Sequence, residues 1–145
     1  MNVIDVLGVP ASPYTRKMLA LMRYRQIPYR AIWGSHMDLP KGLPPPKVKL
    51  IPTIYLNTAA GKEALVDSTP IIDLLEDLYK DRAVRPSDEV LRFLDLLIED
   101  YADEWLTKAM FHYRWNFSED AKNAAPLIAY GQNPQFDSAS ARAMA

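Results

Sequence analysis

Prolines divide the first half of the chain into short segments, and this limits each helix or strand to the stretch between two of them. A proline inside a helix or a central strand removes a backbone hydrogen bond, so it stands at an element's start, at its end or in a loop. Pro28 ends one helical pattern, and the prolines from Pro40 to Pro46 rule out regular structure in a long loop. The sequence therefore predicts only short strands and helices before Tyr79.

The hydrophobic pattern gives the order of these elements. Strands are expected where short runs are rich in apolar and β-branched residues, and helices where apolar residues recur every three or four positions. The predicted helices start at Ser12-Pro13 and at Ser68-Thr69-Pro70, since serine suits the N-cap and proline the first turn. The predicted order is strand 3–8, helix from Ser12 to 25, strand 29–33, loop 35–49, strands 53–56 and 64–66 joined by 57–62, and helix 68–79.

The second half reads as helical. The charged stretch 82–86, which ends in Pro86, is the predicted linker between a domain 1–81 and a helical domain 87–145. A long helix is expected from Ser87 to about Arg114, with an acidic first turn that suits the helix dipole.

The apolar stripe of this long helix needs other helices to cover it. Beyond Asn116 the pattern weakens, and 137–145 offers no apolar face, so we expect the chain to stop inside a helical domain that once continued. Glu104 and Lys108 form a predicted i,i+4 ion pair. The stripe consists of Val90, Leu94, Leu97, Ile98, Tyr101 and Trp105.

Composition excludes several classes of function. The 145 residues carry 17 Lys+Arg and 18 Asp+Glu, a net charge of −1, and this argues against a nucleic-acid protein. No stretch approaches the ~20 apolar residues of a membrane span, and Asp5 interrupts any signal sequence, so we expect a cytoplasmic protein. With no cysteine there is no disulfide, thiolate metal site or redox pair. Any thiol chemistry must therefore be the ligand's.

Three short motifs stand on the predicted elements in order: Ser12-Pro13-Tyr14, Leu50-Ile51-Pro52-Thr53 and Asp67-Ser68. In this order the sequence resembles the N-terminal domain of the cytosolic glutathione transferases, and their serine-type members in particular. The resemblance covers Met1 to about Tyr79. It implies an α/β thioredoxin-like N-terminal domain followed by an all-α C-terminal domain, of which this chain holds a part.

The resemblance implies an enzyme that conjugates glutathione to a hydrophobic electrophile, with no metal and no other cofactor, and that works as a homodimer. It makes Ser12 the catalytic hydroxyl. A hydroxyl bond worth ~1.5–3 kcal/mol and a helix N-terminus worth ~0.3–1 kcal/mol together lower a thiol pKa of ~8.5 by roughly one to two units. Serine before proline is also an ordinary helix cap. Tyr14 is a second candidate hydroxyl whose spacing equally suits core packing.

The other two motifs are expected to bind glutathione. In the family the proline at the position of Pro52 is cis, and the backbone of the residue before it, here Ile51, pairs with the cysteinyl unit of glutathione. Without the resemblance, Pro52 would be interpreted as an ordinary proline at a strand edge. Asp67, where the family usually has Glu, would pair with the γ-glutamyl ammonium, and Ser68 with the helix amides would bind the carboxylate. A helix cap is the alternative for this pair, and Lys49 is a candidate for the glycyl carboxylate.

Tyr101, Trp105 and Met110 are candidates for the second, hydrophobic site, although residues of this kind usually form interdomain core. The acidic run from Glu99 to Glu104, with His112, suggests a metal or acid-base cluster, or more simply a solvated or ion-paired helix face.

The rival to a transferase is a binding module that has kept the fold and lost turnover. Asp67 in place of Glu, Leu50 in place of a polar residue and the abrupt end of the chain favour this alternative.

Overall fold

The computed structural model describes residues 3–37 and 39–133. Its strands form a single four-stranded sheet, in which β1 pairs in parallel with β2 and antiparallel with β3, and β3 pairs antiparallel with β4. The spatial order is β2-β1-β3-β4. The strands are β1 (Ile4–Gly8), β2 (Tyr29–Trp33), β3 (Thr53–Thr58) and β4 (Gly61–Leu65).

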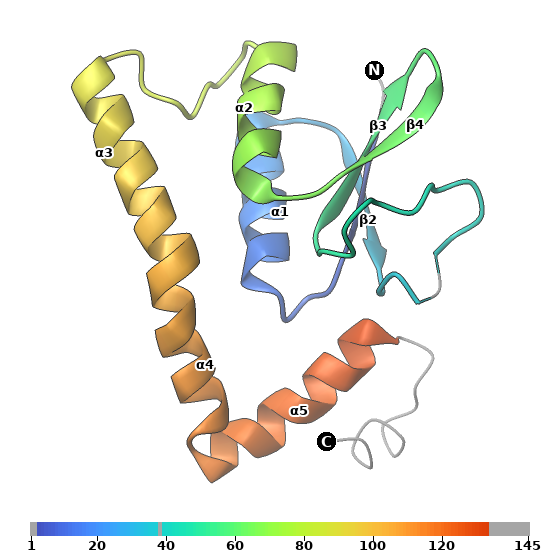
Figure 1. Ribbon diagram of the computed structural model, residues 1–145, viewed down its shortest axis with the longest axis vertical. Coiled ribbons are helices and arrows are strands. Elements are labelled where there is room, and N and C mark those ends of the chain that lie inside the picture. The colour runs from blue at the N-terminus through green and yellow to red at the C-terminus, as the bar shows by residue number, and fades with distance from the viewer. Residues whose placement is uncertain (1–2, 38, 134–145) are drawn as a thin grey trace.

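Two helices, α1 (Pro13–Arg25) and α2 (Ser68–Leu78), lie on one face of this sheet (Figure 1). A βαβ unit followed by a ββα unit is the thioredoxin-like arrangement that the sequence predicts, and the helical region follows it. The core lies between the sheet and the two helices, and it consists of Ile4, Val6, Met18, Leu19, Met22, Ile27, Ile54, Ile71, Ile72 and Leu75.

The hairpin between β3 and β4 is tighter than predicted. The ladder runs to the pair Thr58 and Gly61, so only two residues form the turn in place of the predicted connection 57–62. Gly61 has φ +120°, a conformation that suits glycine because it has no Cβ.

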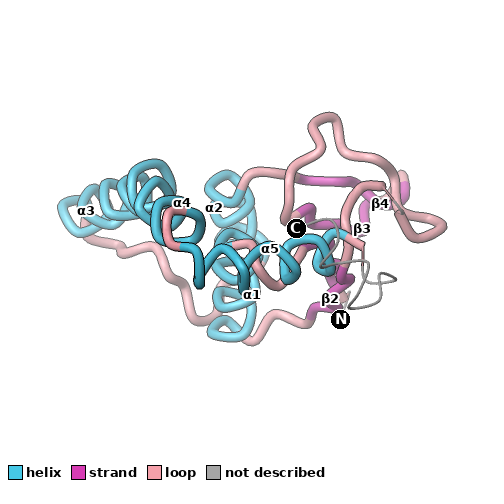
Figure 2. Tube along the Cα trace, turned by 90° about the horizontal axis from the view of Figure 1, so that it is seen from below, coloured by secondary structure: helices cyan, strands magenta, loops and turns pink. Residues whose placement is uncertain are grey.

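The rest of the described chain is a helical arm. It comprises α3 (Glu89–Asp100), a π-helical segment η1 (Tyr101–Leu106), α4 (Thr107–Trp115) and α5 (Ser118–Gln132). Figure 2 shows three layers, with the sheet on one side, α1 and α2 in the middle, and α3 and α4 outside them. No helix in the described ranges is long and apolar enough to cross a membrane.

The helix α5 was not predicted, because the apolar pattern beyond Asn116 is weak and Pro126 lies inside the helix. It folds back toward the loop between β1 and α1, where a Cβ on Gly131 would stand 3.3 Å from Cβ of Val9. The small-residue end, 137–145, lies outside the described residues.

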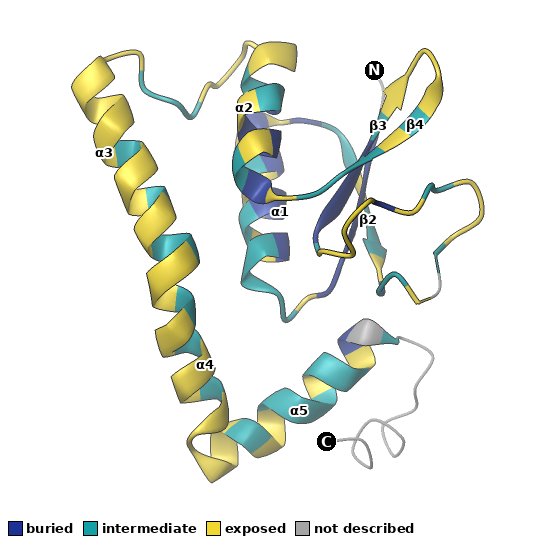
Figure 3. Cartoon of the chain, viewed as in Figure 1, coloured by how far each residue is buried: buried dark blue, intermediate teal, exposed yellow. Residues whose placement is uncertain are grey.

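The predicted apolar stripe is not covered. Its side chains, from Val90 to Trp105, are between 43% and 67% exposed. Figure 3 shows the less exposed residues of the arm along the side that faces α1 and α2. That side carries the acidic residues Asp95, Glu99 and Asp103, which are partly buried. The arm therefore docks by its polar side.

The predicted ion pair between Glu104 and Lys108 is wrong. Lys108 Nζ lies 4.2 Å from the centre of the Trp105 ring, a cation–π contact. Glu104 is an exposed residue on the inner side of η1, and the π-helical segment changes the register on which an i,i+4 pair depends.

Asp5 is a buried carboxylate in the central strand β1. Its oxygens accept hydrogen bonds from Arg30 Nε, at 2.7 Å, and from Lys62 Nζ. Burial raises the pKa of Asp5, but the bonds and charges of Arg30 and Lys62 together outweigh burial and hold the pKa below its ordinary value. The ionised carboxylate thus stabilises the folded sheet.

We expect Asp5→Asn to lower the free energy of unfolding by about 1.5–3 kcal/mol at pH 7, because two charge-assisted bonds are weakened. Since the folded pKa is the lower one, this contribution is present above the unfolded pKa of ~3.9 and is lost as pH falls through the folded pKa. Urea unfolding of wild type and variant at pH 7 and at pH 3 measures it. Asp77→Asn, at an exposed position, is the control. An equal loss for both variants would contradict the expectation.

Candidate functional site

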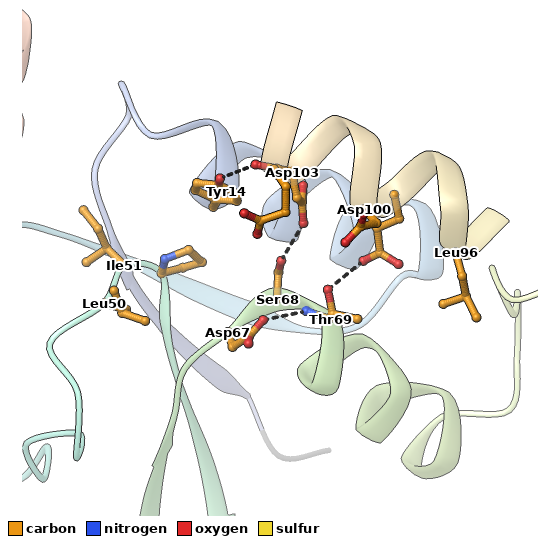
Figure 4. A pocket seen from close by; sticks show the side chains of 12 residues that line it. Tyr14, Leu50, Ile51, Asp67, Ser68, Thr69, Leu96, Asp100 and Asp103 are labelled. Atoms are coloured by element: carbon orange, nitrogen blue, oxygen red, sulfur yellow. Dashed lines mark hydrogen bonds between the residues drawn. The ribbon is translucent and has the colours of Figure 1, made fainter. Parts of the chain in front are cut away.

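A cavity of about 630 Å³ lies between the start of β3, the start of α2 and the acidic side of α3 and η1 (Figure 4). One wall is largely apolar and the opposite wall is largely acidic. The apolar side is the segment before β3, with Leu50, Ile51 and Pro52. The rest of the lining consists of Tyr14 from α1, Asp67, Ser68 and Thr69 at the start of α2, and Leu96, Glu99, Asp100, Asp103 and Glu104 on α3 and η1.

The segment before β3 is held in place by side-chain hydrogen bonds. Thr53 Oγ1 donates to the Leu50 carbonyl oxygen at 2.7 Å, and His36 Nε2 lies 3.0 Å from the same oxygen. The peptide bond between Ile51 and Pro52 is cis. These contacts direct Leu50, Ile51 and Pro52 toward the cavity, while Lys49 is exposed and does not line it.

The start of α2 forms the floor of the cavity. Asp67 has φ 75°, in the left-handed region that Asp tolerates better than most residues, and its carboxylate accepts a bond from Thr69 N at 3.2 Å. Ser68 is buried, and its Oγ accepts a bond from Lys17 Nζ at 3.1 Å. The predicted pair Asp67-Ser68 is therefore a helix cap that also lines a cavity.

The start of α1 lies beside the cavity. Ser12 is the N-cap of α1, and its Oγ accepts a bond from Thr15 N at 3.2 Å. It is not among the residues that line the cavity. Tyr14 does line it, and its hydroxyl donates to the Asp103 carbonyl oxygen at 2.8 Å. A Cβ on Gly8 would lie 2.5 Å from Thr15 Oγ1, so glycine is needed for this close approach of β1 to α1.

The opposite wall includes the π-helical segment η1. The Asp103 carbonyl accepts bonds from the hydroxyls of Tyr14 and Thr107, the latter at 3.0 Å. Short π-helical segments are frequent at functional sites, because they disturb the regular helical hydrogen bonds. Here the segment gives Tyr14 an acceptor on the arm.

Two cations hold the acidic wall against the N-terminal domain. Lys17 Nζ lies 2.9 Å from Glu99 Oε1 and 2.5 Å from Asp103 Oδ2. Arg85 Nη1 lies 2.9 Å from Asp95 Oδ2 and 2.6 Å from Glu99 Oε2. These bonds connect α1 and the linker to α3 and η1, and so they close the cavity.

The same contacts set the charge of the wall. Burial raises the pKa of Glu99, but the hydrogen bonds and charges of Lys17 and Arg85 together hold it below the ordinary value. Burial lowers the pKa of Lys17, but its bonds to Asp103 and Glu99 raise it above the ordinary value overall. Lys17 and Glu99 are therefore both ionised at neutral pH.

Several predicted residues lie elsewhere. Tyr101 and Trp105 are exposed and, like Met110, do not line the cavity. His112 packs against the rings of Tyr113 and Phe117. Among the described residues, no group of three or more His, Asp or Glu side chains is arranged to hold a metal ion.

Sequence reasoning missed Lys17, which reads as a solvent-facing residue of α1, and Arg85 in the linker. The available signal was the recurrence of acid at Asp95, Glu99 and Asp103, a helical spacing on one side of the long helix. Of the two interpretations of the acidic run, the ion-paired face holds for Glu99 and Asp103.

A family model described as the N-terminal domain of glutathione S-transferase matches residues 6–83, more than half of the chain. The chain belongs to the glutathione S-transferase family. No curated protein matches it.

Solved glutathione S-transferase structures share its fold. A glutathione S-transferase from Methylobacterium radiotolerans, in complex with glutathione sulfonate, is 20% identical over 90% of this chain, with a TM-score of 0.61. Glutathione transferase Omega 1C from Trametes versicolor is 15% identical, with a TM-score of 0.61. The match covers 99% of this chain and 67% of the Trametes chain. A family member from Pseudomonas fluorescens, with bound glutathione, is 19% identical over 97% of this chain and 80% of its own, with a TM-score of 0.55.

The chain spans 61% of the length of the Methylobacterium protein.

We expect Arg85→Met to lower the free energy of unfolding by about 3 kcal/mol, because it leaves the partly buried Glu99 and Asp95 without this cation. Arg92→Met, at an exposed position on α3, is the matched control and should stay within about 0.5 kcal/mol of wild type. Chemical denaturation followed by tryptophan fluorescence measures both, since Trp105 lies on the arm. Equal stability of the two variants would show that the arm does not depend on Arg85.

Proposed function

We propose that this cavity binds glutathione. The observation that carries the proposal is that one cavity is lined by Tyr14, by Ile51 and Pro52, and by Asp67 and Ser68, which belong to three motifs far apart in the sequence. Membership of the glutathione S-transferase family supports it, as do the glutathione sulfonate and glutathione in the Methylobacterium and Pseudomonas structures.

Each part of glutathione has a proposed partner. The γ-glutamyl carboxylate meets the Ser68 hydroxyl and the free amides at the start of α2, where the helix dipole favours an anion. The γ-glutamyl ammonium pairs with Asp67, which is exposed and lines the cavity. The backbone N–H and C=O of Ile51 pair with the cysteinyl unit.

We further propose that the bound thiol is activated at the start of α1. Ser12 Oγ accepts its bond from Thr15 N, so its own proton is free to be donated to a thiolate. The thiol proton leaves to solvent, and the sulfur's electron pair forms the new C–S bond. The group displaced from the electrophilic carbon leaves with the electron pair of the broken bond. Stabilising the thiolate is thus the main chemical task of the protein.

The hydrophobic electrophile is proposed to lie beside the sulfur, against the apolar side of the cavity. Leu50 and Ile51 provide apolar contacts there. We also propose a homodimer, and the exposed apolar stripe of α3 and η1 supports this because a stripe of that size needs a partner.

A non-catalytic binding module remains the second candidate. Ser12 serves as a helix cap outside the residues that line the cavity, and this observation favours binding without turnover. Of the two candidates, only the transferase lowers the pKa of the glutathione thiol.

The test is a titration of glutathione into the full chain, with thiolate absorbance followed against pH. We expect saturable binding and a thiol pKa below ~8.5. Ser12→Ala should return the thiol pKa toward that value by about one to two units, since a charge-assisted hydrogen bond is lost.

Ser12→Thr is the matched control, because it keeps both the hydroxyl and a good N-cap. Ser12→Thr should give the wild-type pKa of the bound thiol. Ser12→Ala should also lower the free energy of unfolding by about 1 kcal/mol, because the helix cap is lost. Binding with an unshifted thiol pKa in wild type would favour the binding module. No binding at all would reject the transferase and leave a transferase-like fold that serves as an interaction module.

A further inference from the structure

We infer that Lys17 is a positioning residue for the γ-glutamyl carboxylate of glutathione, because its ammonium holds the Ser68 hydroxyl as a donor toward the cavity. This inference rests on the proposed function. None of the three motifs includes Lys17, and it lies one helical turn after Tyr14 on α1.

The Lys17 ammonium has three protons and three partners. Its Nζ lies 3.1 Å from Ser68 Oγ, 2.9 Å from Glu99 Oε1 and 2.5 Å from Asp103 Oδ2. An ammonium donates and never accepts. Ser68 Oγ must therefore be the acceptor in its bond with Lys17, and the side-chain position is fixed by contacts from three elements.

This assignment decides the direction of the Ser68 hydroxyl proton. Because Lys17 takes one of the oxygen's two lone pairs, the proton of Ser68 points elsewhere. The nearby acceptor is Asp103 Oδ2 at 3.4 Å, which is longer than a good O–H···O bond of ~2.5–3.0 Å. The Ser68 hydroxyl lines the cavity, so a carboxylate placed there would be the better acceptor.

Lys17 also supplies the charge that an anion needs. Five of the residues that line the cavity are acidic, and no lysine or arginine stands among them. A carboxylate at Ser68 would be repelled by the nearby Asp103 and Glu99 if these were not paired. The Lys17 ammonium contacts Ser68 and both acids, so it compensates the repulsion at the point where the carboxylate would bind.

The experiment measures the affinity of the full chain by calorimetry for two ligands: glutathione, and glutathione with its γ-glutamyl carboxylate converted to the amide. The proteins are wild type, Lys17→Met, Lys17→Gln and Lys41→Met, the last an exposed lysine that serves as the control. Circular dichroism and urea unfolding establish that each variant is folded.

We expect Lys17→Met to weaken glutathione binding at least tenfold and to change binding of the amide by less than threefold, with Lys41→Met like wild type for both. Ser68→Ala should show the same preference between the ligands. In the double variant with Ser68→Ala, Lys17→Met should weaken glutathione binding by far less than tenfold, because Lys17 and Ser68 act together on the same carboxylate.

Equal weakening of both ligands would overturn the inference, since it would mean that Lys17 only holds the arm in place. Unchanged glutathione binding would also overturn it. If Lys17→Met does not fold, Lys17→Gln is tested with the same two ligands. It keeps a hydrogen-bond donor for Ser68 but lacks the positive charge, so it should weaken binding of glutathione more than binding of the amide. Failure of wild type to bind glutathione is a separate result that rejects the proposed function and this inference with it.

Discussion

The attachment of the helical arm to the N-terminal domain depends on two cations. Lys17 bonds to Glu99 and Asp103, and Arg85 bonds to Glu99 and Asp95. Ion pairs exposed to water contribute little, but Arg85 and Glu99 are largely shielded from it, so removing one partner leaves a charge without compensation. The position of α3 and η1 follows from these bonds, and the cavity exists because that wall is held there.

This polar attachment has a consequence for the opposite side of the arm. The apolar stripe from Val90 to Trp105 faces away from α1 and α2 and is largely exposed. Exposed apolar surface of this extent is typical of an interaction surface. The N-terminal domain needs no such cover, because its core lies between the sheet and its own two helices.

The elements of the N-terminal domain were predictable because their signals are local. Ser12 and Asp67 cap helices through bonds to residues two or three positions along the chain, and such bonds do not depend on the rest of the fold. The hairpin turn was predicted too long, since register depends on how two strands pair. The helix α5 was missed because the apolar pattern beyond Asn116 is weak and a proline stands inside the helix.

For the site, the three motifs and the helices and strands that carry them could be predicted from local signals along the chain. The packing of these elements brings Tyr14, Ile51, Asp67 and Ser68 to one cavity and leaves Tyr101 and Trp105 outside it. It also decided the roles of Lys17 and Arg85. The acids recur at helical spacing, but the sequence does not show which distant cation pairs with them, because Lys17 and Asp103 are more than eighty positions apart. A helix cap, by contrast, is formed by residues only a few positions apart.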